Sequence, residues 1–262
     1  MADYSELARN ARIASLSMIY WAGSCHVGSC FSCADILSVV YSLAKVDGEL
    51  KEDRDRVVIS KGWVAALVYF FLVHKGILPD KVLRDFYLPG TPYIGLLERR
   101  VRGVEFLGGS MGIGFLGSLG YALSKKIKKE KGVVYCLMSD GEMQIGMTWE
   151  CAAISAHHKL DNLIVICDYN RLQAMGNPKD ILSIEPLRER WESFGWSVLE
   201  VDGHNHANIE RVLLRRRTKP TLIIAKTTKG AGSKVFAGKN LWHYKNVDDD
   251  VYDEVMREIT SA

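Results

Sequence analysis

The chain has 262 residues, 48% hydrophobic and 25% charged, which suits one large soluble α/β domain and is marginal for two. Its net charge of +3 is too small to indicate binding to nucleic acid or to an anionic membrane. The N-terminal sequence lacks a signal pattern and the six cysteines lack the spacing of a secreted disulfide scaffold, so we expect a cytoplasmic protein with reduced thiols.

The first predicted elements are two helices, a strand and a third helix. Apolar residues recur at helical intervals from Tyr4 to Trp21, which indicates an amphipathic helix. Ser32 is a candidate N-cap for a second helix that runs to Ala44, with Asp35 placed as in a capping box. A strand over residues 56–60 and a buried helix over 63–74 follow. The apolar run inside that helix, from Trp63 to Val73, is too short to cross a bilayer.

The rest of the chain alternates between strands and helices. An irregular crossing at 89–105 leads to the glycine-rich segment 108–114, which opens a helix that ends near Ile127. Further strands are expected at 133–138, 163–167, 197–201 and 221–226, with helices at 147–158, around Trp191, at 207–217 and at 249–259. This alternation predicts a doubly wound, mostly parallel sheet with helices on both faces.

Two polar motifs follow neighbouring strands of that sheet. Asp140-Gly141-Glu142 comes after the first strand, and Asp168-Tyr169-Asn170 comes after the next one, with one crossover helix between them. A right-handed βαβ unit places both strand ends at the same edge, so we expect Asp140 and Asn170 to face each other. Their carboxylate and amide oxygens suit Mg²⁺, which keeps open positions for phosphate oxygens.

Taken alone, the first motif is weak, because Asp and Gly are common turn residues. Two further features strengthen it. The glycine-rich segment 108–114 would let backbone approach a ligand closely, and His26 and His243 lie in segments that we expect to be loops. The two polar motifs, the glycine-rich segment and the two histidines together favour a diphosphate cofactor.

These residues make the chain resemble the transketolase family, specifically its N-terminal, diphosphate-binding half. The resemblance covers essentially the whole chain and is strongest at residues 140–142, 159–163, 168–170, 226–230 and 242–243. It implies a thiamine diphosphate-binding fold, thiamine diphosphate and Mg²⁺ as cofactors, and one domain over residues 1–262.

The resemblance also implies roles for individual residues. Asp140, Asn170 and the backbone carbonyl of Leu172 match the Mg²⁺ ligands. His26 and His243 match histidines that handle protons on substrate oxygens, work that suits imidazole near neutral pH. Besides the metal ligands, the implied cofactor-binding residues are Ser29, Gly109, Ser110, Met111, Gly141, Glu142, Lys229 and His243.

Three positions depart from the family pattern. Trp63 and Thr91 stand where the family usually has histidines, and Ile145 stands where it has a glutamate at a subunit contact. We expect transfer of a two-carbon unit to an aldehyde or ketone acceptor, with altered donor specificity. The donor could be an unusual sugar or a 2-oxo acid such as pyruvate, and a non-catalytic cofactor-binding scaffold stays open.

The chain offers no candidate for the pyrimidine-binding domain of this family. The resemblance therefore implies that the pyrimidine-binding and C-terminal domains lie on a separate chain, in a heterotetramer with two copies of each chain. On its own the chain should bind the cofactor weakly and catalyse nothing.

Two other site or family assignments stay open. Cys25, His26, Cys30 and Cys33 lie within nine residues and could form a zinc or iron–sulfur module. The E1 class of 2-oxo-acid dehydrogenases uses the same cofactor, although Lys229 and the 242–243 segment favour the transketolase branch.

Overall fold

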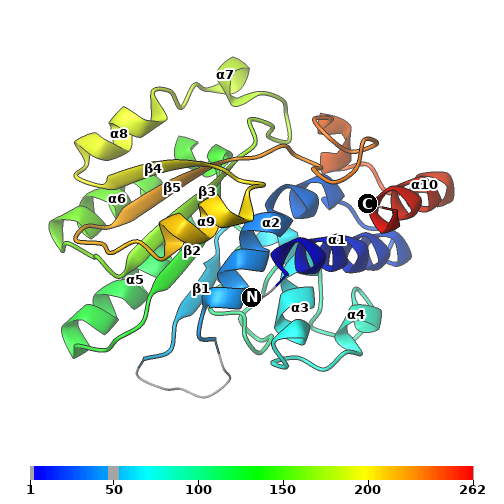
Figure 1. Cartoon of the computed structure of the whole chain (residues 1–262), viewed down its shortest axis with the longest axis horizontal. Helices are drawn as coiled ribbons and strands as arrows, with labels where there is room; N and C mark the ends of the chain where they lie inside the picture. Colours follow the sequence, from blue (N-terminus) through cyan, green and yellow to red (C-terminus); the bar gives the residue numbers. More distant parts are fainter. Residues whose placement is uncertain (1–2, 47–52, 262) are drawn as a thin grey trace.

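A central sheet organises the protein (Figure 1). The computed structural model describes residues 3–46 and 53–261, so the other residues of the predicted domain lie outside it. In this described part the sheet has five strands, all parallel, in the order β1-β2-β3-β5-β4. The strands are β1 (Arg56–Ile59), β2 (Val134–Ser139), β3 (Leu163–Tyr169), β4 (Ser197–Asp202) and β5 (Thr221–Lys226). The predicted doubly wound parallel sheet is confirmed.

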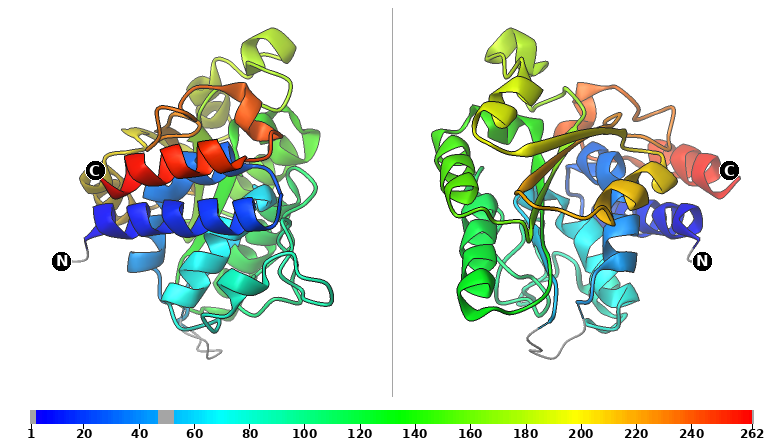
Figure 2. Two further views of the ribbon diagram at one scale, coloured as in Figure 1. Left: turned by 90° about the vertical axis from the view of Figure 1, so that its right-hand side faces the viewer. Right: turned by 60° about the vertical axis from the view of Figure 1, so that its left-hand side comes forward.

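Helices cover both faces of the sheet (Figures 1 and 2). Ile164 and Ile166 of β3 belong to the core cluster that includes residues of α1, α2, α3 and α9, whereas Leu163 and Val165 belong to the cluster with α5, α6 and α8. Burial on both sides explains why these strands are almost continuously apolar. The first group is α1 (Tyr4–Trp21), α2 (Val27–Leu43), α3 (Ala65–His74) and α9 (His206–Leu213); the second is α5 (Ile113–Lys128), α6 (Gly146–His157) and α8 (Leu187–Ser193).

Three further α-helices complete the described residues. The last helix, α10 (Asp249–Thr260), lies beside α1, as the left view of Figure 2 shows. The rings of Tyr20 and Tyr252 stack between these two helices with centroids 4.2 Å apart. The short helices α4 (Val82–Asp85) and α7 (Pro178–Ile181) sit in the connections. No helix in residues 3–46 and 53–261 is long and apolar enough to cross a membrane.

The predicted start of the second helix is wrong. Helix α2 begins at Val27, with His26 as its N-cap in a left-handed backbone conformation (φ 74°). A backbone hydrogen bond from His26 to the carbonyl of His243 holds that conformation at 3.1 Å. Ser32 is therefore buried inside the helix, and Asp35 accepts hydrogen bonds from the Arg12, His204 and His206 side chains instead of capping anything.

The predicted helix over 63–74 also begins differently. Gly62–Val64 form a short 3₁₀ turn, and α3 starts at Ala65. Gly62 packs directly on the backbone of Gly108, where an added Cβ would lie 1.2 Å from the Gly108 carbonyl oxygen. This contact requires glycine at position 62. The neighbouring Trp63 is 44% exposed.

Candidate functional site

The two polar motifs meet at one edge of the sheet, as predicted. Ser139 at the end of β2 pairs in register with Asp168 of β3. Asp140 follows directly, and its Oδ2 accepts a hydrogen bond of 2.7 Å from the backbone N–H of Arg171. The Asp140 carboxylate therefore contacts the turn that begins at Asn170.

Asp140 is a buried carboxylate, with only 2% of its surface exposed. Burial, followed by the charge of Asp168, raises the pKa of Asp140 to about 6, although Lys61 and backbone N–H groups oppose the shift. The anionic form thus has too little positive charge around it. A divalent cation would supply that charge, so the residue fits a metal ligand.

A second feature of this edge fits a diphosphate. Gln173 Nε2 is buried and has no hydrogen-bond partner among the described residues. It lies 3.1 Å from the position that a Cβ on Gly141 would occupy. A buried N–H group without an acceptor is costly, and an oxygen-rich ligand beside Gly141 would satisfy it.

Asn170 is held by the buried Asp168. Its Nδ2 donates to Asp168 Oδ2 at 3.0 Å and to Ser32 Oγ at 3.1 Å. These bonds fix the orientation of the amide, and its Oδ1 accepts from the backbone N–H of Leu172 at 3.0 Å. A carbonyl oxygen has two acceptor sites, so Oδ1 retains one for a metal ion.

Asp168 itself ties several elements together. It accepts from Ser32 on α2, from Thr227 after β5 and from the ammonium of Lys61 after β1. Burial alone would raise the pKa of Asp168, but Lys61 and the hydroxyl donors hold it below its ordinary value. Lys61, Ser32 and Thr227 were not predicted as site residues, although an Asp near the end of a buried strand signals the need for such partners.

Lys229 connects the Leu172 turn to His243. Its side chain is almost fully buried, and Nζ lies 3.0 Å from the Leu172 carbonyl oxygen and 2.6 Å from His243 Nδ1. Burial and Lys61 lower the pKa of Lys229 to about 8, and burial and Lys229 lower the pKa of His243 to about 3. A charged lysine therefore donates to a neutral imidazole.

His26 lies against His243 in an aromatic cluster. Its ring stacks on Trp63 with centroids 4.8 Å apart and meets His243 edge-on at 5.0 Å and Tyr244 at 5.6 Å. Burial, then Lys229 and Lys61, lowers the pKa of His26 to about 4. Ser29, in the first turn of α2, is buried beside it, and its carbonyl faces Lys61 Nζ at 3.5 Å.

The glycine-rich segment approaches the same edge through Glu142. Oε1 of Glu142 accepts from the backbone N–H of Gly112 at 2.9 Å and from Ser60 Oγ, and Oε2 accepts from Ser139 N at 2.7 Å. The carboxylate is 1% exposed and occupied within the protein, so it anchors the loop that carries Gly109, Ser110 and Met111. Ser110 and Met111 reach the surface of the chain.

The three departures lie in different surroundings. Trp63 stacks on His26. The Thr91 hydroxyl donates to the carbonyls of Asp85 and Leu88 in its own turn. Ile145 caps α6 next to Gly112, with its Cγ2 3.4 Å from where a Cβ on that glycine would be. Of the three, Trp63 is the one whose ring contacts a candidate catalytic residue in the described structure.

The predicted alternative of a cysteine metal module does not form. The thiols of Cys30 and Cys33 are buried in α2, where Cys33 donates to backbone carbonyls of the preceding turn. Within residues 3–46 and 53–261, no group of three or more His, Cys, Asp or Glu side chains is placed to hold a metal ion. The spacing reflects the packing of a buried helix.

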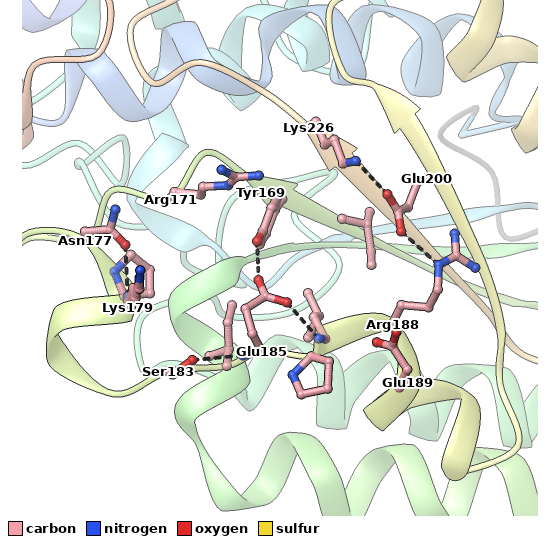
Figure 3. Close-up of a pocket in the computed structure, with 15 residues that line it drawn as sticks. Tyr169, Arg171, Asn177, Lys179, Ser183, Glu185, Arg188, Glu189, Glu200 and Lys226 are labelled. Atoms are coloured by element: carbon pink, nitrogen blue, oxygen red, sulfur yellow. Dashed lines mark hydrogen bonds and ion pairs between the residues drawn. The ribbon is translucent and has the colours of Figure 1, made fainter.

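A cleft of about 500 Å³ lies beside the Asn170 turn, with Tyr169 and Arg171 in its lining (Figure 3). Tyr169 points toward Glu185, and Lys226 and Arg188 both point toward Glu200. Glu200 thus pairs with two cations, whereas Glu185 accepts from a neutral phenol. Its lining does not include His26, Asp140 or Lys229.

Known proteins with sequences similar to this chain belong to one family. The family described as "Transketolase, thiamine diphosphate binding domain" matches residues 4–259. A subunit named for apulose-4-phosphate transketolase in Phocaeicola vulgatus is 34% identical over 94% of this chain and 89% of that protein. The subunit SqwG of a Clostridium 6-deoxy-6-sulfo-D-fructose transketolase is 32% identical over 98% and 96%.

Solved structures agree with this match. The transketolase of Campylobacter jejuni superposes with a TM-score of 0.92 and 29% identity. The match covers 99% of this chain but 43% of that one, so the chain spans about two fifths of the longer protein. These comparisons confirm the resemblance that the motifs indicated.

Proposed function

The chain belongs to the transketolase family, in the part occupied by its thiamine diphosphate-binding domain, and on that premise we propose that it is the cofactor-binding subunit of a split, thiamine diphosphate-dependent transferase. Residues 1–262 form a single domain in this proposal, and a partner chain brings the pyrimidine-binding and C-terminal domains in a 2+2 heterotetramer. The near-complete coverage of two relatives named as subunits supports it.

The observation that carries the proposal is the Asp140 carboxylate, buried against the Asn170–Leu172 turn. Asp140, Asn170 Oδ1 and the Leu172 carbonyl would hold Mg²⁺. The two carbonyl oxygens each accept one hydrogen bond, from Leu172 N and from Lys229, and each retains a second lone pair. Oxygen donors of this kind suit a hard cation that also binds phosphate.

The diphosphate would lie against Gly141, where the Gln173 amide lacks an acceptor among the described residues. Gly109, Ser110 and Met111 would contact the rest of the cofactor, and Lys229 and Ser29 would approach it from the histidine side. Glu142 serves as a positioning residue in this proposal, because its carboxylate already accepts hydrogen bonds from Gly112, Ser60 and Ser139.

When bound, thiamine diphosphate supplies an electron sink that allows the C–C bond beside a substrate carbonyl to break. His26 and His243 would hold and move protons at the substrate oxygens. Both rings are neutral at pH 7 because of their lowered pKa values, so each offers one donor and one acceptor nitrogen. Lys229 donates to Nδ1 of His243, which leaves the ring hydrogen of His243 on Nε2.

The donor would differ from that of an ordinary transketolase. The indole of Trp63 lies over His26 and cannot accept a proton, and the Thr91 hydroxyl is directed into its own turn. A pocket with these groups favours a C1-hydroxylated ketose less strongly. The two subunit-type relatives are named for apulose 4-phosphate and a sulfofructose, which supports an unusual sugar as the donor. A 2-oxo acid such as pyruvate is the second candidate, because Thr91 replaces the family histidine that recognises the C1 hydroxyl of a ketose and Trp63 adds an apolar ring.

The test is turnover by the chain assembled with its co-expressed partner, in thiamine diphosphate and Mg²⁺. Xylulose 5-phosphate and pyruvate are supplied separately, each with an aldehyde acceptor, and products are followed by mass spectrometry. Fast use of the ketose with no use of pyruvate would end the altered-donor idea while leaving the transferase intact. Cofactor binding without turnover of any donor would indicate a scaffold. Full turnover by the pure chain would contradict the split enzyme.

A further inference from the structure

The thiol of Cys25 lies directly against the ring of His26. Its Sγ is 3.0 Å from His26 Nδ1, in the loop between α1 and α2. The cysteine is half-buried and forms no disulfide within the described residues. A sulfur atom at this distance from a ring nitrogen is in hydrogen-bond contact, and one of the two atoms must supply the hydrogen.

The charge states of the two groups identify the donor. Burial raises the pKa of the Cys25 thiol, so it keeps its hydrogen at neutral pH. Burial, then Lys229 and Lys61, lowers the pKa of His26 and keeps it neutral, and the other groups facing its ring are His243, Tyr244 and Trp63. A thiol sulfur accepts hydrogen bonds weakly, whereas the lone pair of a neutral imidazole accepts them well. The S–H group therefore donates to Nδ1, and the ring hydrogen of His26 sits on Nε2.

The surroundings hold the ring in this arrangement. The backbone of His26 is tied to the carbonyl of His243, and its ring plane is set by the stack on Trp63. His243 receives an equivalent hydrogen bond at Nδ1 from Lys229. Both candidate catalytic histidines thus have a donor at Nδ1, one a thiol and the other an ammonium.

We propose that Cys25 is a positioning residue that fixes His26 in the Nε2–H tautomer. In that tautomer the neutral ring donates a hydrogen bond from Nε2 to a substrate oxygen. A histidine in the wrong tautomer offers a lone pair where a hydrogen is needed, which is costly in enzymes that depend on one ring orientation. The catalytic consequence rests on the proposed function, whereas the tautomer itself does not.

The direct test is nitrogen NMR of the full chain labelled with ¹⁵N-histidine, with His26→Gln used to assign the His26 signals. We expect an unprotonated Nδ1 and a protonated Nε2 at pH 7. Cys25→Ser retains a donor and should preserve that pattern, whereas Cys25→Ala should give signals averaged between the two tautomers. Cys151→Ala removes a thiol from the opposite face of the sheet and is the matched control. An unchanged tautomer in Cys25→Ala would overturn the proposal.

Turnover by the assembled enzyme gives a second readout. Cys25→Ala should lower kcat about 10-fold with little change in cofactor affinity, and Cys25→Ser should recover most of that loss. Equal losses in Cys25→Ala and Cys25→Ser would contradict a donor role for this side chain. An assembly inactive with every sugar would count against the proposed function alone, because the NMR pattern would still decide the tautomer.

Discussion

The candidate site has a strand-end side, with Asp140 and Asn170, and a histidine side, with His26 and His243, and different kinds of structure hold them. Asp140 and Asn170 stand at the ends of adjacent parallel strands, and the buried Asp168 ties their surroundings together. His26 instead caps a helix and His243 ends a short 3₁₀ helix (Asn240–His243), and a backbone hydrogen bond and ring contacts hold them. The first arrangement depends on strand register, and the second depends on a few long-range contacts.

Both sides carry residues that match the family, Asp140 and Asn170 on one side and His26 and His243 on the other. The two sides differ in the residues that surround these positions. The histidine side carries Trp63, and Cys25 also lies there against His26. Substitutions on that side can change substrate specificity without disturbing the strand ends, because loops and helix caps tolerate substitution better than buried strands do.

The largest loss of stability on the strand-end side should come from removing the Lys61 ammonium that pairs with Asp168. Lys61→Met leaves a fully buried carboxylate without its cation and should lower the free energy of unfolding by about 3–5 kcal/mol. Urea unfolding measures the loss. Lys126→Met is the matched control, since its pair with Asp161 is long and exposed and should contribute less than about 1 kcal/mol. Equal effects of the two substitutions would contradict the buried pair.

A substitution at Trp63 tests whether the histidine side determines donor specificity. Trp63→His replaces the indole stacked on His26 with an imidazole that can bind a hydroxyl. The ratio of kcat/KM for xylulose 5-phosphate to that for pyruvate should rise about 10-fold, the size of one hydrogen bond to a substrate oxygen. Trp63→Phe keeps an apolar ring and should leave the ratio unchanged. A ratio that does not respond to Trp63→His would remove Trp63 from the account of specificity.

The free energy of unfolding should decrease in acid, partly because of His26. The pKa of His26 falls from 6.5 in the unfolded chain to about 4 in the fold. Between those pH values the unfolded state binds a proton that the folded ring does not, so stability decreases as pH falls from 6.5 to 4. This loss should be about 1 kcal/mol after allowance for solvent screening, and His26→Gln should reduce it. Unfolding curves at about pH 7 and pH 4.5 measure it, and an identical pH response in His26→Gln would exclude His26 as its source.

The strand-end side could be predicted from the sequence because its signals are local. An apolar run, a turn motif and one crossover helix fix where Asp140 and Asn170 lie, and the register of β2 and β3 agrees. The start of α2 could not be predicted, since it depends on the bond from His26 to the distant His243 backbone. Ser32 looks like a helix cap in the sequence, and only the fold shows that Asp168 lies opposite it.

The charged partners are harder still to predict. Lys61 gives no local signal of its role, because lysines are mostly exposed and nothing nearby in the sequence demands burial. Its partner Asp168 comes from a strand that is reached only after the long crossing and α5 and α6. Pairings of this type follow from the three-dimensional fold.

The most direct test of the central claim is calorimetric titration of thiamine diphosphate with Mg²⁺ into the chain assembled with its partner. Wild-type protein should bind, and Asp140→Asn should weaken binding by about 100-fold or more. The variant should keep its melting temperature, because burial raises the pKa of the Asp140 carboxyl group and a neutral amide avoids the cost of a buried charge. Undiminished, Mg²⁺-dependent binding to a folded Asp140→Asn variant would contradict the account.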